Sequence, residues 1–346
     1  MQKREYKVTI GMPVFNVEKY IRNSLAHALE QDFEDIEILI VDDCGSDNSM
    51  TIVRDMQTSH PKGSCIRIFS HNENRGVAEA RNTIIEQALG AYIFFLDSDD
   101  LVTPRSISCM YQAAIENKAE VVYGSMTIFD DEKEKYSVVL PSLVLKGEDA
   151  LTNYIYSDVR KNIPGSSCNI LIQKDFLHKH HLRYPNMRIG EDLMFNEELQ
   201  PKVVSAVLLS DITYCYIRHA NSLMKYHKRD VIDIQEVYNS LQYSEIQKKY
   251  CQALKDKPYY DGKCAKTMKG IFYSACSIIK HRCRLNGQVS DKEIRDSMKH
   301  PASLATILSF KHHKLPNLLF WLLGILPPSV SIAAIKVIGK KKGLIR

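Results

Sequence analysis

The amino-acid sequence predicts an α/β fold: a mostly parallel sheet flanked by helices, followed by a smaller helical C-terminal region. Over the first hundred residues, short apolar runs alternate with amphipathic stretches, which is typical of strand–helix–strand units. Polar clusters follow most of these runs directly, at the sheet edge where ligands bind in such folds. Beyond about residue 227 the hydrophobic period is that of helices alone.

Each predicted strand is a short apolar run, and each early helix lies between two such runs. Runs rich in Val, Ile, Leu and Phe, without polar alternation, predict strands that are buried on both faces. We expect strands at residues 8–12, 36–41, 66–69 and 92–96, and helices at 17–29, 48–57 and 77–89. Because a helix separates consecutive strands, these strands are expected to be parallel.

The chain beyond residue 120 is mixed in character. Apolar runs at 121–129 and 136–140 flank the charged turn 130–133 and predict a hairpin. The further expected elements are a short helix opening at Gly190-Glu191-Asp192, an apolar run at 203–210, helices at 231–249 and 263–280, and a helix that a capping box starts at Ser290 and Pro301 ends. We therefore expect an α/β domain at 1–225, a helical domain at 226–315 and a basic, apolar tail at 316–346.

Composition and charge exclude several classes of protein. With 346 residues, 45% of them hydrophobic and 25% charged, the chain is neither disordered nor a small disulfide scaffold. Its nine cysteines, an odd number without a Cys-x-x-Cys pair or zinc spacing, fit a reducing cytosol. The charged N-terminus lacks the apolar core of a signal peptide. The net charge of +5 is concentrated after Asp296, where no acidic residue follows, which argues against a nucleic-acid partner.

Carboxylates follow two of the predicted strands. Asp42 and Asp43 end the second strand, where a carboxylate can accept hydrogen bonds from a nucleotide base or ribose. Turn and cap residues would look the same there. Asp97 and Asp99 follow the run 92–96, and hard oxygen ligands at that position suit Mg²⁺ or Mn²⁺ beside a diphosphate.

Two further segments carry charged side chains that could either bind a ligand or serve a structural role. Arg81, near the start of the helix at 77–89, has a guanidinium that can bind a phosphate bidentately, or pair on the helix surface with an acidic residue. Glu191 and Asp192 follow Gly190, and two carboxylates there can also complement a helix dipole.

Five motifs, in order and at similar spacing, resemble glycosyltransferase family 2 over about residues 5–220. They are Ile10-Gly11-Met12-Pro13-Val14-Phe15-Asn16-x-Glu18, Val41-Asp42-Asp43-Cys44-Gly45-Ser46-Asp47-x-Ser49, the helix start from Asn74-x-Gly76 to Ala80-Arg81-Asn82, Gly90-Ala91-Tyr92-Ile93 leading to Leu96-Asp97-Ser98-Asp99-Asp100, and Gly190-Glu191-Asp192. The sequence departs from the family at Cys44, where many members have glycine, and at Phe15, where tyrosine is frequent.

This resemblance implies a GT-A fold and an inverting transfer of a hexosyl or N-acetylhexosaminyl group from a nucleotide sugar, usually a UDP-sugar. By the same resemblance, one catalytic residue, a set of donor-binding residues and the ligands of Mn²⁺ or Mg²⁺ are implied. The base that deprotonates the acceptor hydroxyl would be Asp192. The donor would be contacted by Pro13, Phe15, Asp43 (with Asp42 as the alternative), Asn74, Arg81 and Asp97. The metal would be bound by Asp99, and His219 is either a further metal ligand or a plain loop histidine.

The tail at 316–346 is both apolar and basic. Residues 318–326 and 330–338 form two apolar halves separated by Pro327-Pro328, and Lys340, Lys341 and Lys342 follow. Each half is too short to span a bilayer, so we expect the tail to lie in the membrane interface on the cytoplasmic face. The alternatives are a core helix, an oligomer interface or a true transmembrane span.

A membrane-associated enzyme fits a lipid-linked glycan acceptor in capsule, exopolysaccharide or O-antigen synthesis, a step that rests on analogy. The alternative function is a catalytically inactive, nucleotide-binding scaffold of a polysaccharide assembly complex. The presence of Asp43, Asp97, Asp99 and Asp192 together argues against it. A nucleotidyltransferase is disfavoured because residues 13–16 are not a glycine-rich, lysine-containing phosphate loop.

Overall fold

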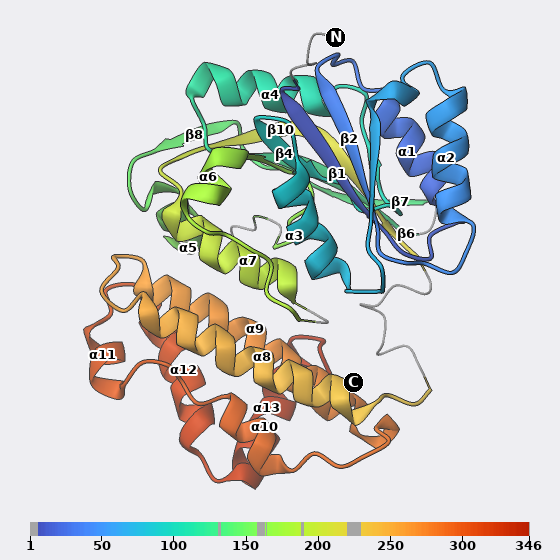
Figure 1. Cartoon of the computed structure of the whole chain (residues 1–346). Helices are drawn as coiled ribbons and strands as arrows, with labels where there is room; N and C mark the ends of the chain where they lie inside the picture. Colours follow the sequence, from blue (N-terminus) through green and yellow to red (C-terminus); the bar gives the residue numbers. More distant parts are fainter. Residues whose placement is uncertain are drawn as a thin grey trace. The chain divides into compact units, whose positions relative to one another are not determined.

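The structure is a computed structural model that describes residues 6–130, 133–157, 163, 165–187, 190–219 and 230–345. The chain divides into two compact units (Figure 1). The first consists of Met1–Leu151 and Ile163–Ala220, and the second of Thr152–Asn162 and Asn221–Arg346.

Four parallel strands lie at one side of the sheet in the first unit, which has ten strands among the described residues (Figure 1). They are β1 (Val8–Val14), β2 (Ile36–Asp42), β3 (Ile66–Ser70) and β4 (Tyr92–Phe95), in the order β3-β2-β1-β4. Each of the three adjacent pairs is parallel. The α/β class and the four predicted strands are therefore confirmed, and their carboxyl ends meet at one edge of the sheet.

The sheet is mixed beyond β4. β6 (Val121–Asp130) and β10 (Ser205–Arg218) are parallel to each other, while β9 (Ile170–Gln173) lies antiparallel between β4 and β6. The short strands β5 (Leu101–Val102), β7 (Lys133–Val138) and β8 (Leu143–Lys146) are also antiparallel to their neighbours. The sequence did not indicate β9, because three apolar residues inside an irregular stretch lack a recognisable period.

Helices on both faces cover the parallel strands. They are α1 (Ile21–Leu29), α2 (Ser49–Ser59), α3 (Val77–Gln87) and α4 (Ser106–Asn117). Later in the chain, α6 (Lys174–Lys179) and α7 (Glu191–Leu199) belong to the same unit, while most of α5 (Ala150–Ser157) belongs to the second unit. The helix predicted to start at residue 17 begins at Ile21. The backbone N–H of Val17 donates to Ser49 Oγ at 2.9 Å, which holds that segment in a turn against the next loop.

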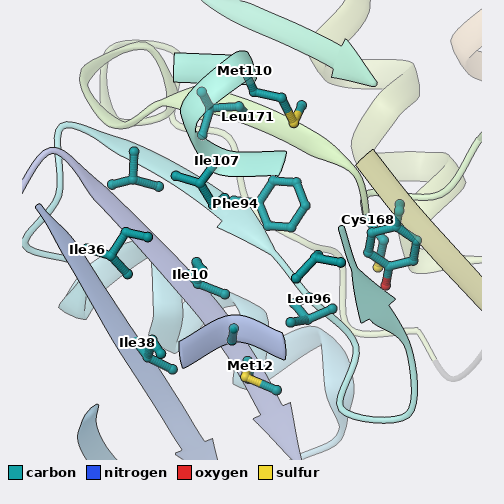
Figure 2. Close-up of a cluster of buried hydrophobic side chains, with 14 of the residues drawn as sticks. Ile10, Met12, Ile36, Ile38, Phe94, Leu96, Ile107, Met110, Cys168 and Leu171 are labelled. Carbon is teal, nitrogen blue, oxygen red and sulfur yellow. The ribbon is translucent and has the colours of Figure 1, made fainter. Parts of the chain in front are cut away.

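The main core lies on one face of these strands. Alternate residues of β1, β2 and β4 point to the same side and pack with α4, as β-strand geometry requires (Figure 2). The side chains drawn there include Ile10, Met12, Ile36, Ile38, Phe94, Leu96, Ile107 and Met110. All of these are at most 4% exposed. This packing fixes the strand ends on which the polar residues stand.

Helix α3 covers the opposite face of β1 at close range. A Cβ added at Gly11 would collide with the side chain of Ile84, so only glycine at this strand position allows the helix to approach. The close approach sets the start of α3, with Arg81, beside the carboxyl ends of β1 and β4.

The second unit is helical and has its own core. Its helices are α8 (Ile234–Ala253), α9 (Tyr260–His281), α10 (Asp291–Ser297), α11 (Leu304–Ser309), α12 (Lys314–Ile325) and α13 (Pro328–Lys341). The capping box at Ser290 and Glu293 is present, and α10 ends at Ser297, before Pro301. Phe320 and Leu323 of α12 and Ile335 of α13 belong to the same buried cluster as α9. Both halves of the apolar tail thus contribute to this core.

None of the helices in the described ranges combines the length and the apolar composition that crossing a bilayer requires.

Candidate active site

The loops after β1 and β2 are hydrogen-bonded to each other, and the ring of Phe15 beside them is exposed to solvent. Asn16 adopts a left-handed φ of 52°, and its Oδ1 accepts a hydrogen bond from the backbone N–H of Ser46 at 2.8 Å. The carbonyl of Pro13 accepts from Ser98 Oγ, which ties β1 to the loop after β4. Phe15 between them is 45% exposed. A fixed, exposed ring at the sheet edge can stack on a planar base.

Asp43 is buried and holds the loop after β3. Its Oδ1 accepts from His71 Nδ1 at 2.7 Å and from the backbone N–H of Arg75 at 2.9 Å, and its Oδ2 accepts from Gly76 N at 2.9 Å. His71 Nε2 lies 2.9 Å from Thr83 Oγ1, so a buried chain of hydrogen bonds joins the β2 loop to α3. An ionised carboxylate has about four acceptor positions, so Oδ2 keeps one for a ligand.

Asp42 and Asn74 are less constrained than Asp43. Asp42 is half-buried, and its Oδ1 accepts from the backbone N–H of Cys44 at 3.1 Å. Cys44 has a φ of 61°, in the left-handed region that favours glycine. The side chain of Asn74 is exposed on the loop before α3.

Arg81 forms ion pairs with three acidic side chains of the site. Its guanidinium is 3% exposed and forms three ion pairs: Nη2 with Asp97 Oδ1 at 2.8 Å, and Nη1 with Glu191 Oε1 at 3.0 Å and Asp192 Oδ1 at 2.7 Å. Burial alone would lower the pKa of Arg81, but the charges of Asp192 and Asp97 raise it well above its usual value. Of the two roles that the sequence left open, pairing with acidic side chains is the one observed, in a buried place rather than on the helix surface.

Aromatic packing and an amide clamp fix the segment that leads to α7. Tyr184 stacks on Phe195 with ring centroids 4.1 Å apart, and the guanidinium of Arg81 lies 5.4 Å from the Tyr184 ring centroid. Asn82 donates to the backbone carbonyl of Tyr184 at 2.9 Å and accepts from its N–H at 2.8 Å. Two side chains of α3 therefore hold Tyr184: Asn82 binds its backbone and Arg81 lies over its ring.

Asp192 lies in the first turn of α7 with two hydrogen-bond donors on one oxygen. Besides Arg81, Ser167 Oγ donates to Asp192 Oδ1 at 2.9 Å. Burial raises the pKa of Asp192, and the charge of Arg81 offsets this only in part. A carboxylate with a raised pKa is a better proton acceptor, which suits a general base. Gly190, with a φ of 89°, forms the turn that starts α7 and could not be replaced without strain.

Three carboxylates crowd the loop after β4. Burial, and then the charge of Asp97, raise the pKa of Asp99 to about 6. Asp100 is buried and accepts from Tyr214 Oη at 2.8 Å and from the backbone N–H of Ile217 at 2.7 Å, which fixes the loop to β10. Burial, and then the charges of Asp97 and Asp99, raise the pKa of Asp100 as well. The surroundings therefore disfavour the charged forms of Asp99 and Asp100, which a nearby cation would favour.

His219 follows β10 and lies beside Asp99. Its Nε2 is 3.1 Å from the backbone carbonyl of Asp99, and its ring stacks on Tyr20 with centroids 3.9 Å apart. Because a carbonyl only accepts hydrogen bonds, Nε2 donates and Nδ1 remains as the ring's ligand atom. Within the described ranges no three His, Cys, Asp or Glu side chains form a complete metal cluster.

The structure brings Arg81, Asp97 and Asp192 into direct contact, and places His219 against the backbone of Asp99. Sequence reasoning missed four residues of this network: His71, Ser167, Glu191 as a partner of Arg81, and Tyr214. His71 directly follows β3, so the rule that finds ligands after parallel strands could have included it. Tyr214 lies in the segment that leads to His219, which the sequence did mark, but its bond to Asp100 was not expected. Ser167 lies far from the motifs in sequence, and no local signal marks its contact with Asp192.

The chain is similar to known proteins in sequence and in fold. Residues 9–179 match the model of the family described as Glycosyl transferase family 2. A relative from Escherichia coli, UDP-Glc:alpha-D-GlcNAc-diphosphoundecaprenol beta-1,3-glucosyltransferase WfgD, is 30% identical over 140 residues, which are 40% of this chain. The match spans 53% of that relative, so this chain covers about half its length.

Two solved structures share the fold. Residues 1–349 of S. aureus TarS in complex with UDP-GlcNAc superpose with a TM-score of 0.55 at 17% identity, over 98% of this chain and 84% of that one. Mannosyltransferase PcManGT from Pyrobaculum calidifontis, in complex with GDP-Man and Mn²⁺, gives a TM-score of 0.52 at 15% identity. It covers 96% of this chain and 88% of that one.

Proposed function

The chain belongs to glycosyltransferase family 2, and from this premise we propose that it is an inverting, metal-dependent enzyme that transfers a hexosyl or N-acetylhexosaminyl group from a UDP-sugar to a glycan hydroxyl. The ion-pair cluster on Arg81 carries the proposal, because one guanidinium holds Asp97 at the strand end and Asp192 on α7. The residue expected to meet the donor and the residue expected to activate the acceptor are thereby fixed relative to each other.

The donor's base would stack on Phe15, beside Pro13, and donate a hydrogen bond to Asp43. Phe15 is exposed, and the remaining acceptor position of Asp43 Oδ2 is fixed in direction by the bonds from His71, Arg75 and Gly76. A preorganised acceptor loses little entropy on binding. Asp42 is the alternative partner for the base, and Asn74 is open to the donor from the neighbouring loop.

Arg81 would act by positioning rather than by binding phosphate. The sequence-based expectation was that it approaches the nucleotide or its phosphates. Its Nη1 and Nη2 atoms are committed to three carboxylates in a buried setting. We therefore assign to Arg81 the alignment of Asp97 beside the ribose or donor sugar and of Asp192 beside the acceptor.

The residues after β4 and β10 fit a divalent cation. Asp99 would supply a hard carboxylate oxygen and His219 its Nδ1. Among the described residues no third His, Cys, Asp or Glu completes a cluster with them, which leaves positions for diphosphate oxygens. Burial, and then the charge of Asp97, raise the pKa of Asp99, and a bound cation would offset both effects. When bound, Mn²⁺ or Mg²⁺ would neutralise charge on the departing nucleoside diphosphate.

Asp192 would take the proton of the acceptor hydroxyl. A hydroxyl held on the face opposite the leaving group attacks the anomeric carbon directly, which inverts its configuration without a covalent intermediate. Oδ2 of Asp192 is the oxygen for this step, because Oδ1 accepts from both Arg81 and Ser167.

The acceptor would be a lipid-linked glycan in capsule, exopolysaccharide or O-antigen synthesis, met at the inner face of the cell membrane. Support comes from the name of the relative WfgD, whose acceptor is a diphosphoundecaprenol-linked sugar, and from the basic charge after Asp296. An oligomeric assembly is compatible with this proposal, and a nucleic acid is not among the partners we propose.

The proposal is tested with a panel of UDP-, GDP- and dTDP-sugars in the presence of Mn²⁺ or Mg²⁺, measuring nucleotide-induced thermal shift and slow donor hydrolysis. We expect one UDP-sugar to raise the melting temperature and to be hydrolysed only with metal. Binding without hydrolysis or transfer by the wild-type protein would favour the inactive scaffold instead. The absence of binding to every nucleotide sugar would contradict the donor assignment.

A further inference from the structure

Helix α12 of the second unit has an apolar face that no other described element covers. Leu315, Leu319, Leu322 and Ile325 are 78%, 40%, 45% and 51% exposed, and their spacing of three and four residues places them on one side of the helix. On the opposite side of the same helix, Phe320 and Leu323 are buried in the core of the second unit. We call the four exposed residues the α12 face.

A shallow pocket adjoins the end of this face. It has a volume of about 450 Å³ and is lined by Arg295, Lys299, His300, Trp321, Gly324 and Ile325. Ile325 thus belongs both to the α12 face and to the pocket wall. Because one water occupies only about 30 Å³, a phosphate group enters this space without a clash.

The pocket carries a net positive charge. Arg295 Nε and Lys299 Nζ lie 3.0 and 3.1 Å from the same oxygen, Asp296 Oδ1, so two cations share a single carboxylate. Burial lowers the pKa of His300, whose Nδ1 accepts from the backbone N–H of Ala302 at 3.0 Å. His300 therefore contributes no charge at neutral pH, and the surplus charge belongs to Arg295 and Lys299.

We propose that the α12 face and its pocket dock the protein on an anionic phospholipid surface, with the four aliphatic side chains in the acyl region and a lipid phosphate in the pocket. This rests on the membrane association in the proposed function and assigns the residues that perform it. Charge decides the occupant: Lys311 and Lys314 precede Leu315, and the chain has no acidic residue after Asp296. Aliphatic side chains preceded by two lysines, beside a pocket with a surplus of positive charge, match a bilayer of negative surface potential.

The test is co-sedimentation of the full chain with vesicles of phosphatidylcholine, either alone or mixed with phosphatidylglycerol. We expect binding to the mixed vesicles and little to pure phosphatidylcholine. The double variant Leu315→Glu/Leu322→Glu should lower the partition coefficient about tenfold or more, because both positions would have to bury a charge. Equal partition of this variant and the wild type would overturn the proposal.

A matched control separates the site from general surface hydrophobicity. Ile115 and Val139 in the first unit are 49% and 62% exposed, so Ile115→Glu/Val139→Glu introduces the same charges at similarly open positions. This control should bind vesicles as the wild type does. A loss as large as that of the α12 variant would overturn the assignment to α12.

The role of the pocket is tested by removing a single positive charge from it and measuring vesicle binding. Lys299→Gln should lower partition to phosphatidylglycerol vesicles about fivefold, since one lysine near an anionic surface contributes roughly that factor. Arg105→Gln, which removes a cation whose side chain is 83% exposed in the first unit, should have no such effect. Equal effects of the two substitutions would overturn the pocket.

Two further measurements distinguish failure of the docking proposal from failure of the proposed function and from dimer formation. The α12 variant should retain the wild-type melting temperature and the UDP-sugar thermal shift, so that failed donor binding contradicts the proposed function and failed vesicle binding contradicts the docking surface. Sedimentation equilibrium is run without lipid. A dimer that Leu315→Glu/Leu322→Glu dissociates, together with no vesicle binding, would show that a second copy occupies the face and would overturn the lipid assignment.

Discussion

Arg81 Nη1 lies 2.7 Å from Asp192 Oδ1, although 111 positions separate the two residues in sequence. The same guanidinium contacts Asp97, which follows β4. A helix that packs closely on β1 and a helix that starts at Gly190 are therefore joined at the point where chemistry is expected. Disturbing this ion pair should affect stability and activity together.

Arg81→Ala should destabilise the protein by about 3–5 kcal/mol, because it leaves buried carboxylates without their cation. The matched control is Arg22→Ala, which breaks an ion pair with Asp55 between side chains that are 61% and 55% exposed. That change should cost less than about 1 kcal/mol. Urea unfolding of both variants measures the difference, and similar losses would contradict the buried role of Arg81.

The two neighbouring aspartates at the end of β2, Asp42 and Asp43, should differ in their effect on nucleotide binding. Asp43→Asn removes the charge that binds His71 and two backbone N–H groups, so we expect UDP affinity to fall at least about tenfold. Asp42→Asn should change it less than about threefold. Calorimetric titration with UDP and metal compares them. The reverse order would make Asp42 the partner of the base.

Asp99→Ala should abolish the part of UDP affinity that depends on metal. The measurement is a UDP titration with Mn²⁺ and with a chelator: the wild type should bind more tightly with Mn²⁺, and the variant should bind equally in both. Asp55→Ala, at an exposed surface position, serves as the control. Metal-dependent binding that survives in Asp99→Ala would rule out this residue as the ligand.

Gly190→Ala should strain the turn that sets α7, because its φ of 89° costs an alanine about 1–2 kcal/mol. Gly270→Ala is the control: Gly270 lies inside α9 with open space where a Cβ would stand, so the substitution should be neutral or stabilising by about 0.5–1 kcal/mol. Thermal melts compare the two. We also expect Gly190→Ala, and not Gly270→Ala, to lower the transfer rate; equal rates would contradict a positioning role for this turn.

The sequence was informative wherever local pattern and chemistry coincide. Apolar runs predicted β1 to β4, and the carboxylates that follow them, such as Asp97 and Asp99, do stand at the sheet edge. The start of α1 was missed, because the contact of Val17 with Ser49 depends on tertiary structure. Ser167 reaches Asp192 across 25 positions and Tyr214 reaches Asp100 across 114, and no local period encodes such pairs. The commitment of Arg81 to carboxylates was an open alternative that only the burial of its side chain decided.

The central claim is that Asp192 is the base of an inverting transfer, and Asp192→Asn tests it most directly. Asparagine keeps the size of the side chain and an acceptor for Arg81 and Ser167, but it cannot take a proton. We expect the variant to bind the UDP-sugar with wild-type affinity by calorimetry, while transfer to a glycan acceptor falls about 10²–10⁴-fold. Transfer at the wild-type rate, with the donor bound, would contradict the account.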